Sequence, residues 1–188
     1  MTVATSKDDL PVSVLVDSST GAWSVNGQPM VLIPRHFLVF TQMEFENEIG
    51  IEATRRIIEA ATYRAVKTWC HREADRNSMK GATILQHYLE QVKRRGLGRY
   101  EISSMDLATG EASIRLFGSI YAAEYGPKAG RATCYMSAAS CRGGMEVVME
   151  SLGHIIDLGC EETSCASDVR EFCEFKVFPT QKSKVKHE

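Results

Sequence analysis

The chain has 188 residues, of which 44% are hydrophobic and 24% charged, and its net charge at pH 7 is −2. These values are those of an ordinary globular domain, and the near-neutral balance argues against binding to nucleic acid or to an anionic membrane. The first ten residues are polar and acidic and no apolar run follows them. We therefore expect a disordered lead, no signal peptide, no membrane span and a cytoplasmic protein.

The N-terminal half indicates a short hairpin followed by three helices. β-Branched and apolar residues at 12–16 and 22–25 flank a Ser-Ser-Thr-Gly turn, which predicts the hairpin. Pro34 then begins a helix that ends at Gly50. Apolar residues spaced three and four apart predict a second helix from residue 51 to the break at Asn77, and a third from residue 84 to about residue 94.

After Gly98 the pattern changes from helical to alternating. Residues 100–102 and 112–116 predict a second hairpin, and residues 132–152 predict a helix. Two final strands are expected at residues 154–158 and 172–178. The fold class is therefore α+β, an antiparallel sheet flanked by helices.

The helix at residues 132–152 is rich in serine, alanine and glycine. Such small side chains favour close packing against a sheet or another helix. Where this helix meets the sheet they also leave room for a cavity, so we expect a small-molecule pocket there.

Five of the six cysteines lie in the last third of the chain, at positions 134, 141, 160, 165 and 173. Without a signal peptide, we expect reduced thiols or metal ligands rather than disulfides. A turn between two strands can bring Glu162, Cys165 and Cys173 together, and the preceding helix can add Cys141. Three thiolates and a carboxylate suit zinc, although buried cysteines of purely packing character would give the same spacing.

The sequence ETSCASDVREFCEFKV, residues 162–177, resembles the 4-vinyl-reductase domain family. This family includes the sensory modules of phenol- and xylene-responsive transcription activators, and its fold is similar to that of a subunit class of vesicle-tethering complexes. The resemblance implies a structural zinc held by Glu162, Cys165, Cys173 and a cysteine of the preceding helix. Cys141 matches that position by its distance, but Ser140-Cys141-Arg142 replaces an aromatic-glycine pair of many members, so the fourth ligand stays open.

The resemblance divides the chain into three parts. Residues 1–95 resemble an uncharacterised bacterial extension fused to this domain, residues 96–178 form the part that resembles the 4-vinyl-reductase domain, and residues 179–188 form a disordered tail. His87 lies about where the family's sensors hold a phenolic hydroxyl, and Tyr121 and Tyr125 are candidate walls of the same pocket. Surface histidines and ordinary strand aromatics are the alternatives.

We expect a domain that binds a small organic ligand, as a sensor or an accessory protein, with a structural zinc closing its pocket. An enzyme or enzyme subunit acting on a small nitrogen- or ring-containing catabolic substrate is the first alternative, and a structural adaptor is the second. An open metal position would favour the enzyme, and a filled core would favour the adaptor. We also expect a homodimer through the N-terminal helices and a catabolic or regulatory partner protein.

Overall fold

The computed structural model describes residues 12–168 and 170–180, so the predicted disordered lead and most of the predicted tail lie outside the described residues. A small meander of three antiparallel strands comes first: β1 Val14–Val16, β2 Trp23–Val25 and β3 Gln28–Met30. The Asn26-Gly27 turn, with both residues at positive φ, joins β2 to β3. The hairpin prediction is confirmed, and β3 is a strand that it did not include.

Three helices follow: α1 Arg35–Ile49, α2 Ile51–Asn77 and α3 Ala82–Arg94. Pro34 precedes α1 and Gly50, at φ 83°, separates α1 from α2, which confirms both predicted boundaries. Ser78 ends α2 in the left-handed conformation. The three helical predictions from the N-terminal half are therefore confirmed.

The large sheet has four antiparallel strands in the order β4-β5-β7-β6. Its strands are β4 Arg99–Asp106, β5 Glu111–Phe117, β6 Leu158–Ser164 and β7 Cys173–Pro179. The predicted hairpin and the last strand are confirmed, whereas the strand expected at residues 154–158 is wrong. Residues 154–157 are coil, and β6 begins where that prediction ended. The adjacent β-branched isoleucines at 155 and 156 favour a strand, but Ile155 is 91% exposed and has no pairing partner in the sheet.

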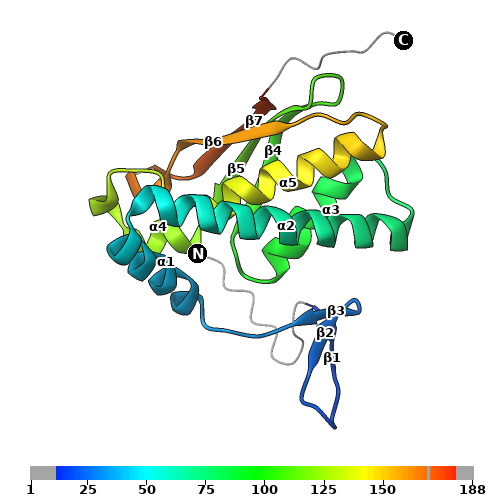
Figure 1. Cartoon of the computed structure of the whole chain (residues 1–188), viewed down its shortest axis with the longest axis horizontal. Helices are drawn as coiled ribbons and strands as arrows, with labels where there is room; N and C mark the ends of the chain where they lie inside the picture. Colours follow the sequence, from blue (N-terminus) through cyan, green and yellow to red (C-terminus); the bar gives the residue numbers. More distant parts are fainter. Residues whose placement is uncertain (1–11, 169, 181–188) are drawn as a thin grey trace.

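Helix α5, Tyr135–Ser151, crosses one face of the large sheet together with α3, and α2 covers α5 on the side away from the sheet (Figure 1). A short helix that the sequence did not predict, α4 Ile120–Tyr125, and two 3-10 turns, η1 Pro127–Ala129 and η2 Ala166–Asp168, complete the fold. Alternate residues of β5 and β7 are buried beneath α5, which gives the sheet one core face and one outer face. The predicted α+β class with helices flanking an antiparallel sheet is confirmed.

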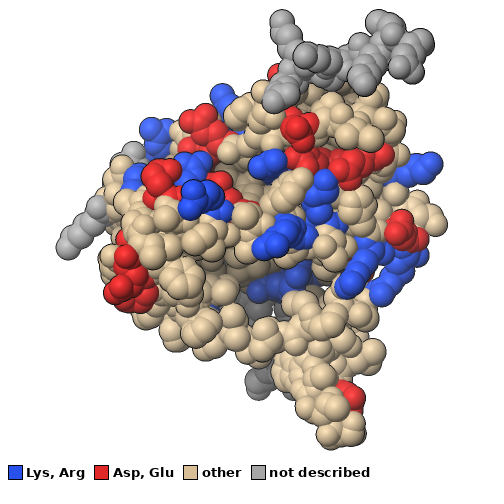
Figure 2. Space-filling view, in the orientation of Figure 1, with Lys and Arg blue, Asp and Glu red and all other residues tan. Residues whose placement is uncertain are grey.

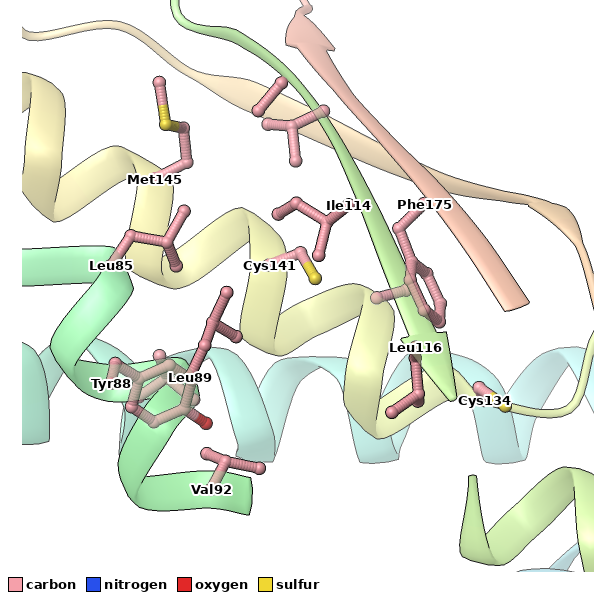
Figure 3. Packing of buried hydrophobic residues seen from close by; sticks show 14 of the residues in the cluster. Leu85, Tyr88, Leu89, Val92, Ile114, Leu116, Cys134, Cys141, Met145 and Phe175 are labelled. Atoms are coloured by element: carbon pink, nitrogen blue, oxygen red, sulfur yellow. The ribbon is translucent and has the colours of Figure 1, made fainter. Parts of the chain in front are cut away.

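The small residues of α5 are explained by close helix packing. A Cβ at Gly144 would lie 2.6 Å from Leu85 Cδ1 of α3, and one at Gly143 would lie 3.3 Å from the Tyr63 carbonyl oxygen of α2. These glycines let two helices approach α5, and the space beside it is filled by buried side chains such as Leu85, Met145 and Phe175 (Figure 3). Close packing, rather than a cavity, is what these small residues provide in the structure.

The small sheet lies on the other side of α2 from the large sheet (Figure 1). Arg72 of α2 donates to the Gln28 side chain at 3.1 Å, and Arg76 donates to the Asn26 carbonyl oxygen. The meander is thus attached to the C-terminal half of α2 by arginine hydrogen bonds. Within the described part of the chain, no helix combines the length and apolar character that crossing a bilayer requires.

Candidate functional site

The turn between β6 and β7 brings three of the predicted metal-binding residues together. Glu162 lies in β6 opposite Phe175, Cys165 follows the last residue of β6, and Cys173 begins β7. Cys134, immediately before α5, is the fourth member, and one ligand atom from each residue lies within 4.8 Å of every other. We call Cys134, Glu162, Cys165 and Cys173 the thiol group.

The sulfur atoms of the thiol group are in contact. Cys134 Sγ lies 3.6 Å from Cys173 Sγ, and Cys173 Sγ lies 3.9 Å from Cys165 Sγ. Glu162 Oε2 accepts the backbone N–H of Cys134 at 2.9 Å, which orients the carboxylate toward the sulfurs. Its other oxygen, Oε1, is buried and has no hydrogen-bond partner within residues 12–168 and 170–180. A buried carboxylate oxygen without a donor is costly, and a bound cation would satisfy it.

Hydroxyl and amide groups surround the sulfurs. Ser167 Oγ lies 3.0 Å from Cys165 Sγ, Ser119 Oγ lies 3.1 Å from Cys134 Sγ, and the Ala166 N–H donates to Cys173 Sγ at 3.3 Å. Each of the three sulfurs therefore has a hydrogen-bonding neighbour outside the group, and such neighbours orient and stabilise metal-bound thiolates.

Electrostatics limit how much negative charge the thiol group holds by itself. Burial, followed by the neighbouring Cys165, raises the pKa of Glu162 to about 8. Shared hydrogen bonds with Cys165 and Cys173 raise the pKa of Cys134 well above its usual range, and the same contacts lower the pKa of Cys165. The four acids thus keep most of their protons in the absence of a counter-charge. A divalent cation would remove this restriction, and three sulfurs with one carboxylate are donors that suit zinc.

Cys141, the residue predicted as the fourth ligand, is not part of the thiol group. It is fully buried in α5 and faces the sheet near Ile114, whereas Cys134 lies at the start of the helix (Figure 3). Seven residues span nearly two helical turns, so both cysteines fall on the same stripe about 10 Å apart along the axis. Helical periodicity therefore does not distinguish them, and the position of the helix against the β6–β7 turn selects Cys134.

A polar network holds the segment that supplies Cys134. Glu46 of α1 accepts hydrogen bonds from Tyr125 at 2.8 Å, Tyr135 at 2.7 Å and Arg131 at 2.6 Å. Its side chain is only 7% exposed. Helix α1 is thereby fastened to the residues on both sides of Cys134, a role for Glu46 that the sequence analysis missed because no local pattern signals it.

His87, the predicted ligand-binding histidine, lies on α3 facing α2. Its Nε2 atom is 3.1 Å from Glu73 Oε2, and its ring stacks on Trp69 with the centroids 5.5 Å apart. The guanidinium group of Arg95 lies over the same Trp69 ring at 5.6 Å. Arg95 Nη2 is buried and no described residue accepts a hydrogen bond from it, which leaves one spare donor beside the Trp69 ring.

Tyr121 and Tyr125 lie on α4, in a neighbourhood separate from His87. The Tyr121 hydroxyl lies 3.7 Å from Met136 Sδ, and Tyr125 contacts Glu46 and Gln42. Five pockets formed by the described residues are lined by neither His87 nor Tyr121 nor Tyr125. The structure therefore brings three of the four predicted metal ligands together and does not bring the three predicted pocket residues together.

Basic side chains gather over α2 on the face shown in Figure 2. The groove on this helix is lined by four arginines and two glutamates, together with alanine and tyrosine: Glu52, Arg55, Arg56, Glu59, Ala60, Tyr63, Arg64 and Arg142. Two of the arginines are neutralised, since Arg55 pairs with Glu59 and Arg142 pairs with Glu146. The groove is thus a mixed, modestly basic surface.

Comparison with known proteins supports the fold. A family model described as "Domain of unknown function (DUF5943)" matches residues 8–103. The phenol-responsive sensory domain of the transcription activator PoxR, solved with phenol, matches with a TM-score of 0.75 at 15% identity, over 91% of this chain and 87% of that one.

Two further solved structures match less closely. A vinyl-4-reductase family protein from Methanocaldococcus jannaschii matches with a TM-score of 0.54 at 17% identity, over 81% of this chain and 85% of that one. A trafficking protein particle complex subunit 3 from Naegleria fowleri, covalently bound to palmitic acid, matches with a TM-score of 0.52 at 12% identity, over 80% of this chain and 97% of that one. No curated protein matches the sequence. These likenesses establish a shared fold with a sensory domain and with a vinyl-4-reductase family protein.

Proposed function

The chain belongs to the DUF5943 domain family, and from its fold and thiol group we propose that it is a small-molecule-binding domain of sensor or accessory type. In this proposal a structural zinc bound by Cys134, Glu162, Cys165 and Cys173 fixes the β6–β7 turn. The observation that carries it is the match to a phenol-responsive sensory domain over nine-tenths of the chain. We also propose that residues 96–178 constitute a domain of the 4-vinyl-reductase type and residues 1–95 its N-terminal extension, with a boundary between α3 and β4.

The donor set favours a structural over a catalytic metal. Structural zinc sites are closed by four protein ligands, whereas catalytic sites keep one position for water or substrate. Here four side chains with mutually close donor atoms would supply the four protein ligands of a closed site. When bound, the metal would supply charge neutralisation for the buried donors and a fixed link between the start of α5 and the last two strands.

We place the polar anchor of the small molecule on the His87 side of the fold. Trp69 lines a groove beside β3, His87 stacks on its ring, and Arg95 adds a buried donor without a described acceptor. A buried donor that lacks an acceptor costs roughly 1–3 kcal/mol, which an oxygen of a ligand would recover. The ligand class that fits is a small ring compound bearing a hydroxyl or carboxylate oxygen, and Tyr121 and Tyr125 have no part in holding it.

A thermal-shift screen of phenols, short carboxylic acids and methylated amines tests this proposal. A ligand that binds only the folded state at about a hundredfold excess over its Kd stabilises it by about 2.7 kcal/mol. We expect hits among phenols or acids whose shift shrinks in His87→Ala and Arg95→Met and persists in the control Tyr121→Phe. Hits that keep their full shift in the first two variants would contradict the placement of the anchor.

A structural adaptor is the second candidate, because the interior beside α5 is filled by side chains and large apolar groups are exposed elsewhere. Exposed apolar residues concentrate on α1 and the segment before it: Val31, Leu32, Phe37, Phe40, Phe45 and Ile49. We propose that a second copy of the chain covers this surface, since contiguous exposed apolar groups are typical of interfaces. A screen without hits on a protein that still dimerises would favour the adaptor.

A further inference from the structure

One of the three cysteines of the thiol group lines a pocket, and the other two do not. A polar pocket of about 140 Å³ is lined by residues on the edge of the group, including Cys165, Glu162, Arg131 and Arg170. Cys165 is 6% exposed, whereas Cys134 and Cys173 are fully buried and do not line this pocket. A water molecule occupies about 30 Å³ in the liquid, so the pocket admits a small polar oxidant.

We propose that Cys165 is a modification site, the cysteine that reacts with hydrogen peroxide, and that Cys173 then forms a disulfide with it. This inference rests on the proposed metal-binding role of the thiol group and adds its regulation by oxidation. Cys173 Sγ lies 3.9 Å from Cys165 Sγ, so a second sulfur is already in contact with the one that the oxidant reaches. Redox-sensing cysteines typically combine solvent access with a neighbouring resolving cysteine.

The reaction balances without a further reductant. The Cys165 sulfur attacks one peroxide oxygen, an S–O bond forms as the O–O bond breaks, and the hydroxide that leaves takes a proton and becomes water. Cys173 sulfur then attacks the Cys165 sulfur, an S–S bond forms, the S–O bond breaks, and a second water leaves. Two thiols are oxidised by two electrons and one peroxide is reduced to two waters. Two of the four donors of the thiol group would be lost, so a metal held there would be released.

Cys70, Cys141 and Cys160 serve as controls because none of them lines this pocket or belongs to the thiol group. Cys70 and Cys141 are fully buried, and burial raises the pKa of both thiols. Cys160 is half-buried in β6, outside the thiol group. Ser167 Oγ at 3.0 Å from Cys165 Sγ marks a further difference, since none of these three cysteines has a comparable hydroxyl contact among the described residues.

The test treats the full chain, as purified, with stepwise hydrogen peroxide and maps disulfides by peptide mass spectrometry, with released zinc followed by a chromogenic chelator. We expect about one disulfide per chain, joining Cys165 to Cys173, reversible by dithiothreitol and accompanied by zinc release. In Cys173→Ser, dimedone should trap a sulfenic acid on Cys165, and Cys160→Ser should behave as the unchanged protein.

Two outcomes would overturn the proposal: a first oxidation at any other cysteine, or a Cys165 that stays reduced at peroxide levels that oxidise a free thiol. The disulfides are mapped in the unsubstituted chain, so this test does not depend on whether a serine variant folds. A Cys165–Cys173 disulfide in a protein that purifies without metal would retain the modification site and overturn the zinc proposal instead.

Discussion

At the scale of single residues, the choice between Cys134 and Cys141 decides which side chains make up the thiol group. Both cysteines are fully buried, Cys134 immediately before α5 and Cys141 within it, but only Cys134 shares contacts with Cys173 and Glu162. Cys141 instead packs in the core beneath the sheet (Figure 3). The two positions therefore offer a matched pair of variants.

We expect Cys134→Ser to lose most of the bound zinc and Cys141→Ala to retain it. Removing one thiolate would open the proposed zinc site, and because a structural zinc contributes on the order of 10 kcal/mol to folding, the melting temperature should fall sharply. Cys141→Ala removes one buried sulfur atom and should cost roughly 1 kcal/mol through a small cavity. Elemental analysis and thermal unfolding of both variants check this, and zinc loss from Cys141→Ala with retention in Cys134→Ser would reverse the assignment.

At the scale of elements, α1 is linked to the thiol group through the segment before α5. Glu46 accepts hydrogen bonds from Arg131 and Tyr135, which flank Cys134, and Gln42 donates to the Thr133 carbonyl oxygen at 2.9 Å. Thr133 Oγ1 in turn lies 3.5 Å from Cys165 Sγ. Helix α1 and the thiol group therefore position the same short segment from opposite sides.

We expect Glu46→Gln to lower the free energy of unfolding by about 2 kcal/mol, because Arg131 loses a charged, nearly buried acceptor. Glu48→Gln, on the exposed side of the same helix, is the matched control and should change it by less than about 0.5 kcal/mol. Urea unfolding measures both changes. Equal effects in the two variants would show that the Glu46 network does not fasten α1.

Elements whose signals are local could be predicted from the sequence, and those that depend on tertiary contacts could not. Periodicity and the terminators Gly50 and Ser78 predict α1 and α2, and alternation predicts the β4–β5 hairpin. Helix α4 has only six residues, too few for a periodic pattern, and β6 (LGCEETS) has two adjacent glutamates and lacks the apolar alternation that indicates a strand. The Glu162, Cys165 and Cys173 cluster follows from one turn, whereas Cys134 depends on where a helix begins.

At the scale of the whole molecule, the exposed apolar surface of α1 and of the segment before it predicts self-association. Leu32 is 75% exposed and Phe40 is 51% exposed, and both belong to a group of exposed large apolar side chains of the kind that marks an interaction surface. We expect the chain to be a dimer by size-exclusion chromatography with light scattering, and Phe40→Asp to shift it to a monomer. Leu107→Asp, at an exposed turn of the large sheet, should leave the dimer intact. A monomer at every concentration of the unchanged chain would contradict the proposed interface.

The proposed zinc would bind donors from the start of α5 and from the β6–β7 turn, and would thereby fix the last two strands against the helices. Native mass spectrometry of the freshly purified, folded chain tests this most directly, since it weighs the intact protein with whatever it holds. We predict about one zinc ion per chain, and loss of the folded charge-state distribution when a strong chelator removes it. A folded protein that carries no metal, and whose charge states are unchanged by the chelator, would contradict the account.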